Sequence, residues 1–591
     1  MKFLGNVLST VVGIFVFIMI FFFGIIIIGL LFGSSDDGKV KVKENSVIEL
    51  DLSQVNLDYA GRFKEDPLEV LFAGEKQYGL IDVLNAIEYA KKDDKIKGIS
   101  ILNNQANLGL AQFKAVRDQL EDFKQSGKFV VAYSNYLTQK DYYLNSVADT
   151  IYLNPVGELD FKGLASEIIY MKDLQEKTGV KMEVLRHGKY KSAVEPFLTQ
   201  EMSPENREQM TVLLNSAWET IVTDISKSRK ISVDSLNSIA NSLGARTPEL
   251  ALAKNMIDRV AYEDEYHNAI KSNLKVDAKK DYESVSILDY TKSIELAKID
   301  FSSKDVIAVV YAQGEIQGGE GKVNIIGEKS INEALKEARE DDDVKAIVLR
   351  VDSPGGSALT SELIWREIEI TKKVKPVIVS MGNLAASGGY YISCNADKIF
   401  AEPSTITGSI GVFGMLPNMK QLADNIGINA EQVKTHDNAT GYSIFEPIDE
   451  NFKTVTLESI ENIYTTFLKR VADGRKMSTE QVDEIAQGRV WTGSDAIKIG
   501  LVDELGGLDD AIKYAAKISK SEKYTVENYP EYEKSFEDII ASLNGVSIFQ
   551  SKEALLKEEL GEENYRVLEQ VKKANNLKGV QTLMPFELKI Q

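Results

Sequence analysis

An internal repeat constrains the fold of this chain more than any other feature. KAIVLRVD at 345–352 resembles KGISILNN at 97–104, and GYYISCNADKIFAEP at 389–403 resembles DYYLNSVADTIYLNP at 141–155, both at an offset of 248 residues. Further on, GLVDEL around Asp503 matches NMIDRV around Asp258 at a slightly smaller offset. Self-similarity of this kind indicates repeated structural units. We therefore expect two divergent copies of one domain, at 45–300 and 301–545.

Each copy alternates short β-branched segments with longer segments of helical spacing. In the second copy we expect strands at 306–312, 345–351 and 376–381, with helices at 331–342 and 361–373. Alternating βαβ units predict an α/β fold with a mostly parallel sheet, whose ligands bind where the strands end. The charged tail is expected to be helical and has no assigned chemistry; it covers residues 546–591.

The N-terminus predicts a membrane anchor. Residues 11–32 carry no charge, and a helix of this length spans the roughly 30 Å hydrocarbon core of a bilayer. The apolar run is long for a secretory signal peptide and lacks a small-residue cleavage site. We therefore expect residues 1–34 to be a retained anchor rather than a cleaved signal. Lysines on both sides of the run leave its orientation open.

Charge and composition exclude several classes of function. The net charge of −20 argues against nucleic-acid binding, which requires basic patches that neutralise phosphates. A single cysteine, Cys394, excludes disulfides within the chain, and the three histidines are scattered. A zinc site is therefore not expected.

Ser387, in MGNLAASGGYYIS, is a candidate nucleophile. It follows a predicted strand by a short loop and begins a helical segment, a setting that exposes nucleophilic serines. The alternative is an ordinary helix-capping serine. Its counterpart in the first copy is Gln139, and the two glycines after it are replaced by Lys140 and Asp141. The fold therefore does not require this serine or its glycines.

Two further loops differ between the copies. DSPGGSA at 352–358 could offer backbone amides to a developing oxyanion, although a plain turn would use the same residues. The first copy has NQANLG at 104–109 instead. Ser409, in TITGSIGVFG, has Phe161 as its counterpart; taken alone, it could belong to an ordinary surface loop.

A nucleophilic serine needs a general base, and no histidine lies near Ser387 in the sequence. We therefore look for the base in the first copy. LRHGKYKSAVEPF at 185–197 places Lys191 opposite Tyr442 of the second copy. Each copy thus lacks what the other has, as expected of one catalytic site divided between two repeats. A lysine acts as a base only when neutral; burial between domains, together with Arg186 and Lys189, would lower its pKa. The alternative is a surface lysine.

Four motifs in this order carry a resemblance to a known family. SPGG, NLAASGGYY, TGSIGV and GKYKSAVEPF, in a duplicated chain, resemble the long form of the signal peptide peptidase A (protease IV) family. The resemblance implies tandem ClpP/crotonase-like domains and a serine endopeptidase with a Ser–Lys dyad. It makes Ser387 the nucleophile and Lys191 the general base, with Ser409 orienting the lysine. Gly356 and Gly388 would supply oxyanion-hole amides.

The resemblance also implies a substrate and a location. Members of this family degrade cleaved signal peptides and other apolar peptides without a metal or organic cofactor. They form homo-oligomers, typically tetramers in the long form, on a single-pass anchor in the bacterial inner membrane, with the catalytic body on the periplasmic side. Two alternatives are a crotonase-type acyl-CoA enzyme, which would typically use Glu or Asp, and a catalytically inactive membrane scaffold, which would not need these motifs together.

Overall fold

The computed structural model describes residues 12–17, 19–20, 41–63, 77–295, 304–532 and 580–584. Most of the predicted anchor at 1–34 lies outside these ranges, as does most of the tail. Within them, no helix has the length and the apolar character needed to cross a bilayer.

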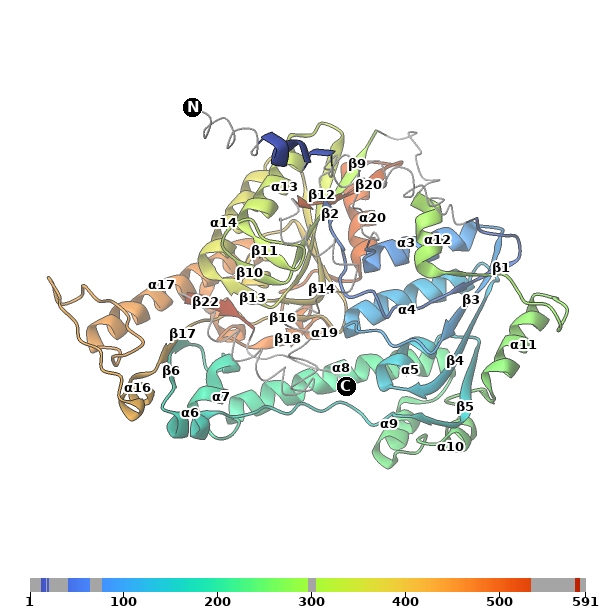
Figure 1. Ribbon diagram of the computed structural model, residues 1–591, viewed down its shortest axis with the longest axis horizontal. Helices are drawn as coiled ribbons and strands as arrows, with labels where there is room; N and C mark the ends of the chain where they lie inside the picture. The colour runs from blue at the N-terminus through green and yellow to red at the C-terminus, as the bar shows by residue number, and fades with distance from the viewer. Residues whose placement is uncertain are drawn as a thin grey trace.

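Two largely parallel sheets with the same strand order organise the chain (Figure 1). The first repeat has the order β7-β5-β4-β3-β1-β8, and in the second the run β19-β15-β14-β12-β9-β20 has the corresponding order. This shared order is the structural counterpart of the sequence repeat. The second sheet also contains β16 (Ile406–Gly408), which pairs with the end of β14, and β18 (Val490–Thr492), which pairs with β16. The strands of the first sheet are β1 (Ser46–Glu49), β3 (Ile96–Leu102), β4 (Phe129–Leu137), β5 (Thr150–Leu159), β7 (Arg259–Val260) and β8 (Ser284–Ser286). Those of the second are β9 (Val306–Gln313), β12 (Val344–Ser353), β14 (Val377–Ala386), β15 (Lys398–Ala401), β19 (Glu504–Leu505) and β20 (Thr525–Tyr529).

Helices cover both faces of the second sheet, which explains its nearly continuous apolar strands. In β12, Ile347, Leu349 and Val351 join the core beneath helices α13 (Glu328–Glu340) and α14 (Ala358–Thr371). The intervening Ala346 and Val348 pack beneath α20 (Leu508–Ser519) on the other face. Successive side chains of a strand point to opposite faces of the sheet, so β12 contributes residues to the cores on both faces.

Most of the predicted elements of the second copy lie close to their expected positions. The helices α13 and α14 each begin three residues earlier than predicted. The largest difference concerns β14, which continues to Ala386 instead of ending at Met381. Its last three residues pair with β16 (Ile406–Gly408), which prolongs the strand. The prediction of a short loop before Ser387 is therefore wrong, because Ser387 directly follows the last residue of β14.

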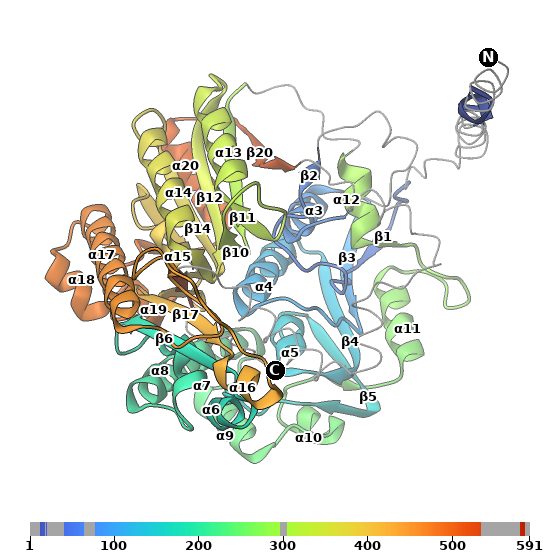
Figure 2. The same ribbon diagram turned by 60° about the vertical axis from the view of Figure 1, so that its left-hand side comes forward.

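A third, mixed sheet joins the two repeats. Its order is β11-β10-β13-β22-β17-β6. Strand β6 of the first repeat runs antiparallel to β17 of the second, from the pair His187–Val412 to the pair Lys181–Asn418; Figures 1 and 2 both show the two strands side by side. The described part of the tail forms β22, so the helical prediction is wrong there. The strands are β6 (Lys181–His187), β10 (Glu315–Gln317), β11 (Ile325–Gly327), β13 (Gly355–Ser357), β17 (Val412–Asn418) and β22 (Val580–Leu583).

A buried ion pair also connects the repeats. The Arg350 guanidinium, on β12, donates from Nε to Asp58 of the first repeat at 2.7 Å, and from Nη1 to Ser380 Oγ and to the Met381 carbonyl. Gln112 donates to the other carboxylate oxygen of Asp58 at 2.8 Å. Both charged side chains are almost fully buried. The carboxylates of Asp352 and Glu402 also interact with the Arg350 guanidinium, but Asp58 is the one that forms the ion pair with it. Loss of Asp58 therefore leaves the guanidinium without this partner in the interior.

We therefore predict that Asp58→Ala lowers the free energy of unfolding by about 3–5 kcal/mol, the typical loss when one partner of a buried pair is removed. Urea denaturation followed by circular dichroism measures this change. Asp94→Ala, on an exposed side chain of the same repeat, serves as the control and should change stability by less than about 0.5 kcal/mol. Equal stability of the two variants would contradict a stabilising role for the pair.

Candidate active site

Ser387 lies at a sharp junction between β14 and the short helix α15 (Gly388–Tyr391). Its backbone has φ 56° and ψ −113°, a conformation that is strained for a residue with a side chain and that clusters at functional sites. The Ser387 amide donates to the Gly408 carbonyl at 2.7 Å, which holds the turn. In the described chain its hydroxyl does not cap α15. The helix-capping interpretation therefore does not account for this serine.

The Lys191 side chain from the first repeat reaches Ser387 in the second. Its Nζ atom lies 2.8 Å from the Ser387 Oγ atom, and both residues are fully buried. Burial lowers the pKa of Lys191 well below its usual range, because an ammonium loses its hydration there. The expected contribution of Arg186 and Lys189 to this shift is not found, because burial accounts for it. Arg186 donates to the Lys191 carbonyl at 3.0 Å, and the Lys189 ammonium lies over the Tyr190 ring.

Ser409 completes the surroundings of the Lys191 amine. It lies between β16 and β17 with φ 51°, and its amide donates to the Arg489 carbonyl at 2.6 Å. Lys191 Nζ lies 3.1 Å from the Ser409 carbonyl oxygen and 3.0 Å from its hydroxyl. The hydroxyl also donates to the Gly488 carbonyl at 3.2 Å. Nζ therefore lies among three oxygen atoms of the second repeat: Ser387 Oγ and the carbonyl and hydroxyl oxygens of Ser409.

Gly488 is a site residue that the sequence analysis missed. It has φ +81°, and a Cβ atom there would lie 2.7 Å from both the backbone nitrogen and the Cβ atom of Lys191. Gly411 leaves room for the middle of the same side chain, where a Cβ atom would lie 3.2 Å from Lys191 Cδ. These glycines form the passage through which the lysine enters the second repeat. Gly488 is visible in the sequence as the first residue of GRVW, but nothing in the sequence shows that it lies against Lys191.

The predicted oxyanion loop lies beside Ser387. Gly355 and Gly356 have φ values of 101° and 154° and form β13, not an irregular turn. A Cβ atom on Gly355 would lie 2.7 Å from the Gly388 nitrogen, and one on Gly356 would lie 2.1 Å from the Ile316 carbonyl oxygen. Glycine is therefore required at both positions for the close approach of β10, β13 and α15. The structure brings the loop and the Gly388 amide together.

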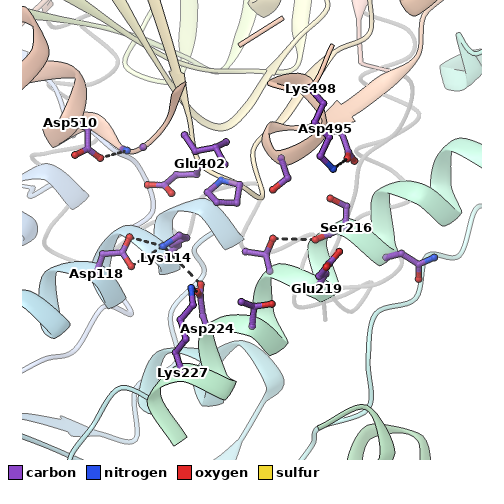
Figure 3. Close-up of a pocket in the computed structure, with 18 of the residues that line it drawn as sticks. Lys114, Asp118, Ser216, Glu219, Asp224, Lys227, Glu402, Asp495, Lys498 and Asp510 are labelled. Carbon is purple, nitrogen blue, oxygen red and sulfur yellow. Dashed lines mark hydrogen bonds and ion pairs between the residues drawn. The ribbon is translucent and has the colours of Figure 1, made fainter. Parts of the chain in front are cut away.

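A separate cavity of about 770 Å³ lies between the repeats. Its lining contains none of the five predicted site residues. Lys114 forms an ion pair with Asp118 at 2.7 Å and lies 3.9 Å from Asp224, as Figure 3 shows. Burial raises the pKa of Glu402, on the opposite wall, to about 7. In the described ranges no group of three or more His, Cys, Asp or Glu side chains is placed to hold a metal ion.

Comparison with known proteins identifies the family of this chain. The model of Peptidase family S49 matches the chain twice, over residues 122–277 and 369–522. Protease 4 of Salmonella typhi is 36% identical over 480 residues, covering 80% of this chain and 77% of that protein. Protease 4 of Haemophilus influenzae is 38% identical, with 75% and 73% covered. The chloroplastic serine protease SPPA of Arabidopsis thaliana is 32% identical, with 79% and 71% covered.

These relatives and the duplicated α/β sheets define a serine peptidase. The chain belongs to Peptidase family S49, and each of its two repeats matches the family model. Among solved structures, a ClpP1 variant from Listeria monocytogenes aligns with 34% of this chain and 94% of its own, at 16% identity and a TM-score of 0.24. That score is too low to bear on the fold.

Proposed function

We propose that this peptidase cleaves peptide bonds with a Ser387–Lys191 dyad divided between the two repeats. The observation that carries the proposal is the 2.8 Å contact between Lys191 Nζ and Ser387 Oγ in a fully buried setting. With its pKa lowered by burial, the lysine is available as a neutral amine, which accepts a proton. An acyl-CoA enzyme or an inactive scaffold would not need this contact.

The proposed mechanism uses Lys191 in both proton transfers. Neutral Lys191 takes the Ser387 hydroxyl proton as the oxygen attacks the peptide carbonyl, and the resulting ammonium protonates the leaving amine. Ser409 orients the lysine through its carbonyl and hydroxyl oxygens. Backbone amides at Gly356 and Gly388 stabilise the oxyanion. A water molecule activated by Lys191 then releases the acyl group.

The proposal extends to location and substrate. The uncharged run at 11–32 supports a single-pass anchor in the bacterial inner membrane, with the catalytic body on the periplasmic side. A peptidase held at the membrane encounters cleaved signal peptides and other apolar peptides. The motif resemblance further supports tandem ClpP/crotonase-like domains and a homotetramer.

The dyad is tested by two variants. Ser387→Ala should abolish cleavage of an apolar fluorogenic peptide, and Lys191→Met should lower kcat/KM about 10²–10⁴-fold, the usual contribution of a general base. Lys189→Met, on an exposed lysine two residues away, is the matched control and should keep full activity. Thermal unfolding verifies that all three proteins are folded. Full activity in either dyad variant would rule out the mechanism.

The pH profile tests the protonation state of the base. Protonated Lys191 cannot accept the serine proton, so kcat/KM should rise about tenfold per pH unit and level off above the pKa of Lys191. Because burial lowers that pKa, the midpoint should lie well below the ordinary lysine value of about 10.4. A midpoint near the ordinary value, or a flat profile with chemistry rate-limiting, would contradict a neutral buried base.

The anchor is tested by truncation. A chain that begins at residue 41 should move from the membrane fraction to the soluble fraction of a bacterial lysate, because the apolar run is gone. Immunoblotting after ultracentrifugation measures the distribution, and retained peptidase activity shows that the catalytic body is intact. Unchanged sedimentation with membranes in high salt would argue against residues 1–34 as the membrane attachment.

A further inference from the structure

The cavity between the repeats has a polar and predominantly acidic lining. Its volume of about 770 Å³ lies within the range of small-molecule sites. Helices α4 (Leu110–Lys124) and α8 (Pro204–Arg229) of the first repeat form one side, and the segments around Glu402, Asp495 and Asp510 of the second form the other, as Figure 3 shows. Six acidic and three basic side chains line it, and none of the described lining residues is aromatic. The excess of acids favours a cationic ligand.

The three lysines of the lining are already paired. In the described part of the chain, each forms an ion pair with a carboxylate of its own repeat: Lys114 with Asp118, Lys227 with Asp224 and Lys498 with Asp495. The carboxylate of Asp510 accepts a hydrogen bond from the Gly507 amide at 2.9 Å. An anion would have to displace a carboxylate to reach one of these lysines. The lining therefore does not form an anion site.

Glu402 is buried with its carboxylate unpaired. The residue directly follows β15 and is 4% exposed. Its backbone is satisfied by Thr405, whose Oγ1 accepts from the Glu402 amide at 3.0 Å and whose amide donates to the Glu402 carbonyl at 3.0 Å. No hydrogen bond or ion pair joins its carboxylate to the residues that the structure describes, and Figure 3 shows this side chain at the cavity. A buried acid without a partner is destabilising, and a ligand that donates to it removes this effect.

The lining also selects among cations. In the described ranges no group of three or more His, Cys, Asp or Glu side chains is placed to hold a metal ion, and a quaternary ammonium is typically held by aromatic rings. A primary ammonium has three N–H donors, which suit a cavity lined by carboxylates and by hydroxyl groups such as that of Ser216. Glu219, on α8, adds a second carboxylate, which acts on Lys498 from beyond ion-pair distance. Two carboxylates from opposite sides favour a ligand with more than one ammonium group.

We propose that this cavity binds a linear aliphatic polyamine, with one ammonium on the Glu402 carboxylate and another at Glu219. The site is separate from the Ser387–Lys191 dyad, because neither dyad residue lines the cavity. Residues of both repeats line it, so a bound polyamine contacts both and stabilises their association by mass action. Binding at this site does not require peptidase activity.

Calorimetric titration of the full-length protein with spermidine measures the proposed binding. We expect one saturable site per chain. Glu402→Gln keeps the shape of the side chain and removes its charge, so it should raise Kd at least about tenfold, the loss expected for a charge-assisted hydrogen bond. Glu219→Gln, on an exposed side chain, should raise Kd about threefold, as expected for an exposed ion pair. Thermal unfolding without spermidine verifies that both variants are folded.

Non-specific attraction of a polycation to a chain of net charge −20 is the alternative. Glu431→Gln is the matched control, because it makes the same change of charge on an exposed residue outside the cavity lining. Its Kd should stay within about twofold of the wild-type value, since exposed charges at a distance are screened by salt. Equal Kd values for the Glu402→Gln and Glu431→Gln proteins would overturn the inference. Absence of saturable binding to the wild type would overturn it as well.

The protonation state of Glu402 provides a second readout. Burial raises the pKa of Glu402 to about 7; Asp118 and Asp510 raise it further, while Lys114 and Arg350 lower it. A bound ammonium stabilises the carboxylate and lowers this pKa, so binding releases protons near neutral pH, and Kd falls as the pH rises from about 6 to about 8. Calorimetry in two buffers of different ionisation enthalpy measures the release, which should disappear in the Glu402→Gln protein. Undiminished proton release in that variant would overturn the role of Glu402.

Discussion

The antiparallel pairing of β6 with β17 is the interaction on which the site depends. Its register ends with His187 opposite Val412, so the chain that leaves β6 passes directly beside the loop that precedes β17. Lys191 lies four residues after the end of β6, and Ser409 lies three residues before the start of β17. A shift of this register would carry the ammonium away from Ser387. Strand pairing between the repeats therefore places Lys191, the proposed base, next to Ser387, the proposed nucleophile.

Burial is the second requirement, and it has two consequences. It lowers the pKa of Lys191 well below its usual range without a contribution from other cations. It also closes the serine to solvent, which is compatible with catalysis only if part of the cover moves. Close packing also explains the glycines around the site, where a Cβ atom would clash with a neighbouring segment. Gly488 and Gly411 admit the lysine from one side, while Gly355 and Gly356 let β22 and β10 approach from the other.

Comparison of the two repeats located most of the site before any coordinates. Ser387, Lys191 and Ser409 were singled out because each is absent from the other copy, and the structure places all three in contact. Three expectations failed for physical reasons. The loop before Ser387 does not exist because β16 extends β14 by pairing with it. Burial, and not Arg186 or Lys189, lowers the pKa of Lys191, because desolvation alone destabilises its ammonium form. The described part of the tail is a strand because two strand edges are available to it.

The sequence by itself determined the duplication, the alternation of strands and helices and the residue types that the chemistry needs. These are properties of local pattern: apolar spacing, turn residues and a comparison of one copy with the other. Tertiary structure alone decided which residues meet. The contact of Lys191 with Ser387, the passage left by Gly488 and the pairing of β22 with β13 each join segments far apart in the chain. Their distances follow from strand register and side-chain packing, which no local pattern encodes.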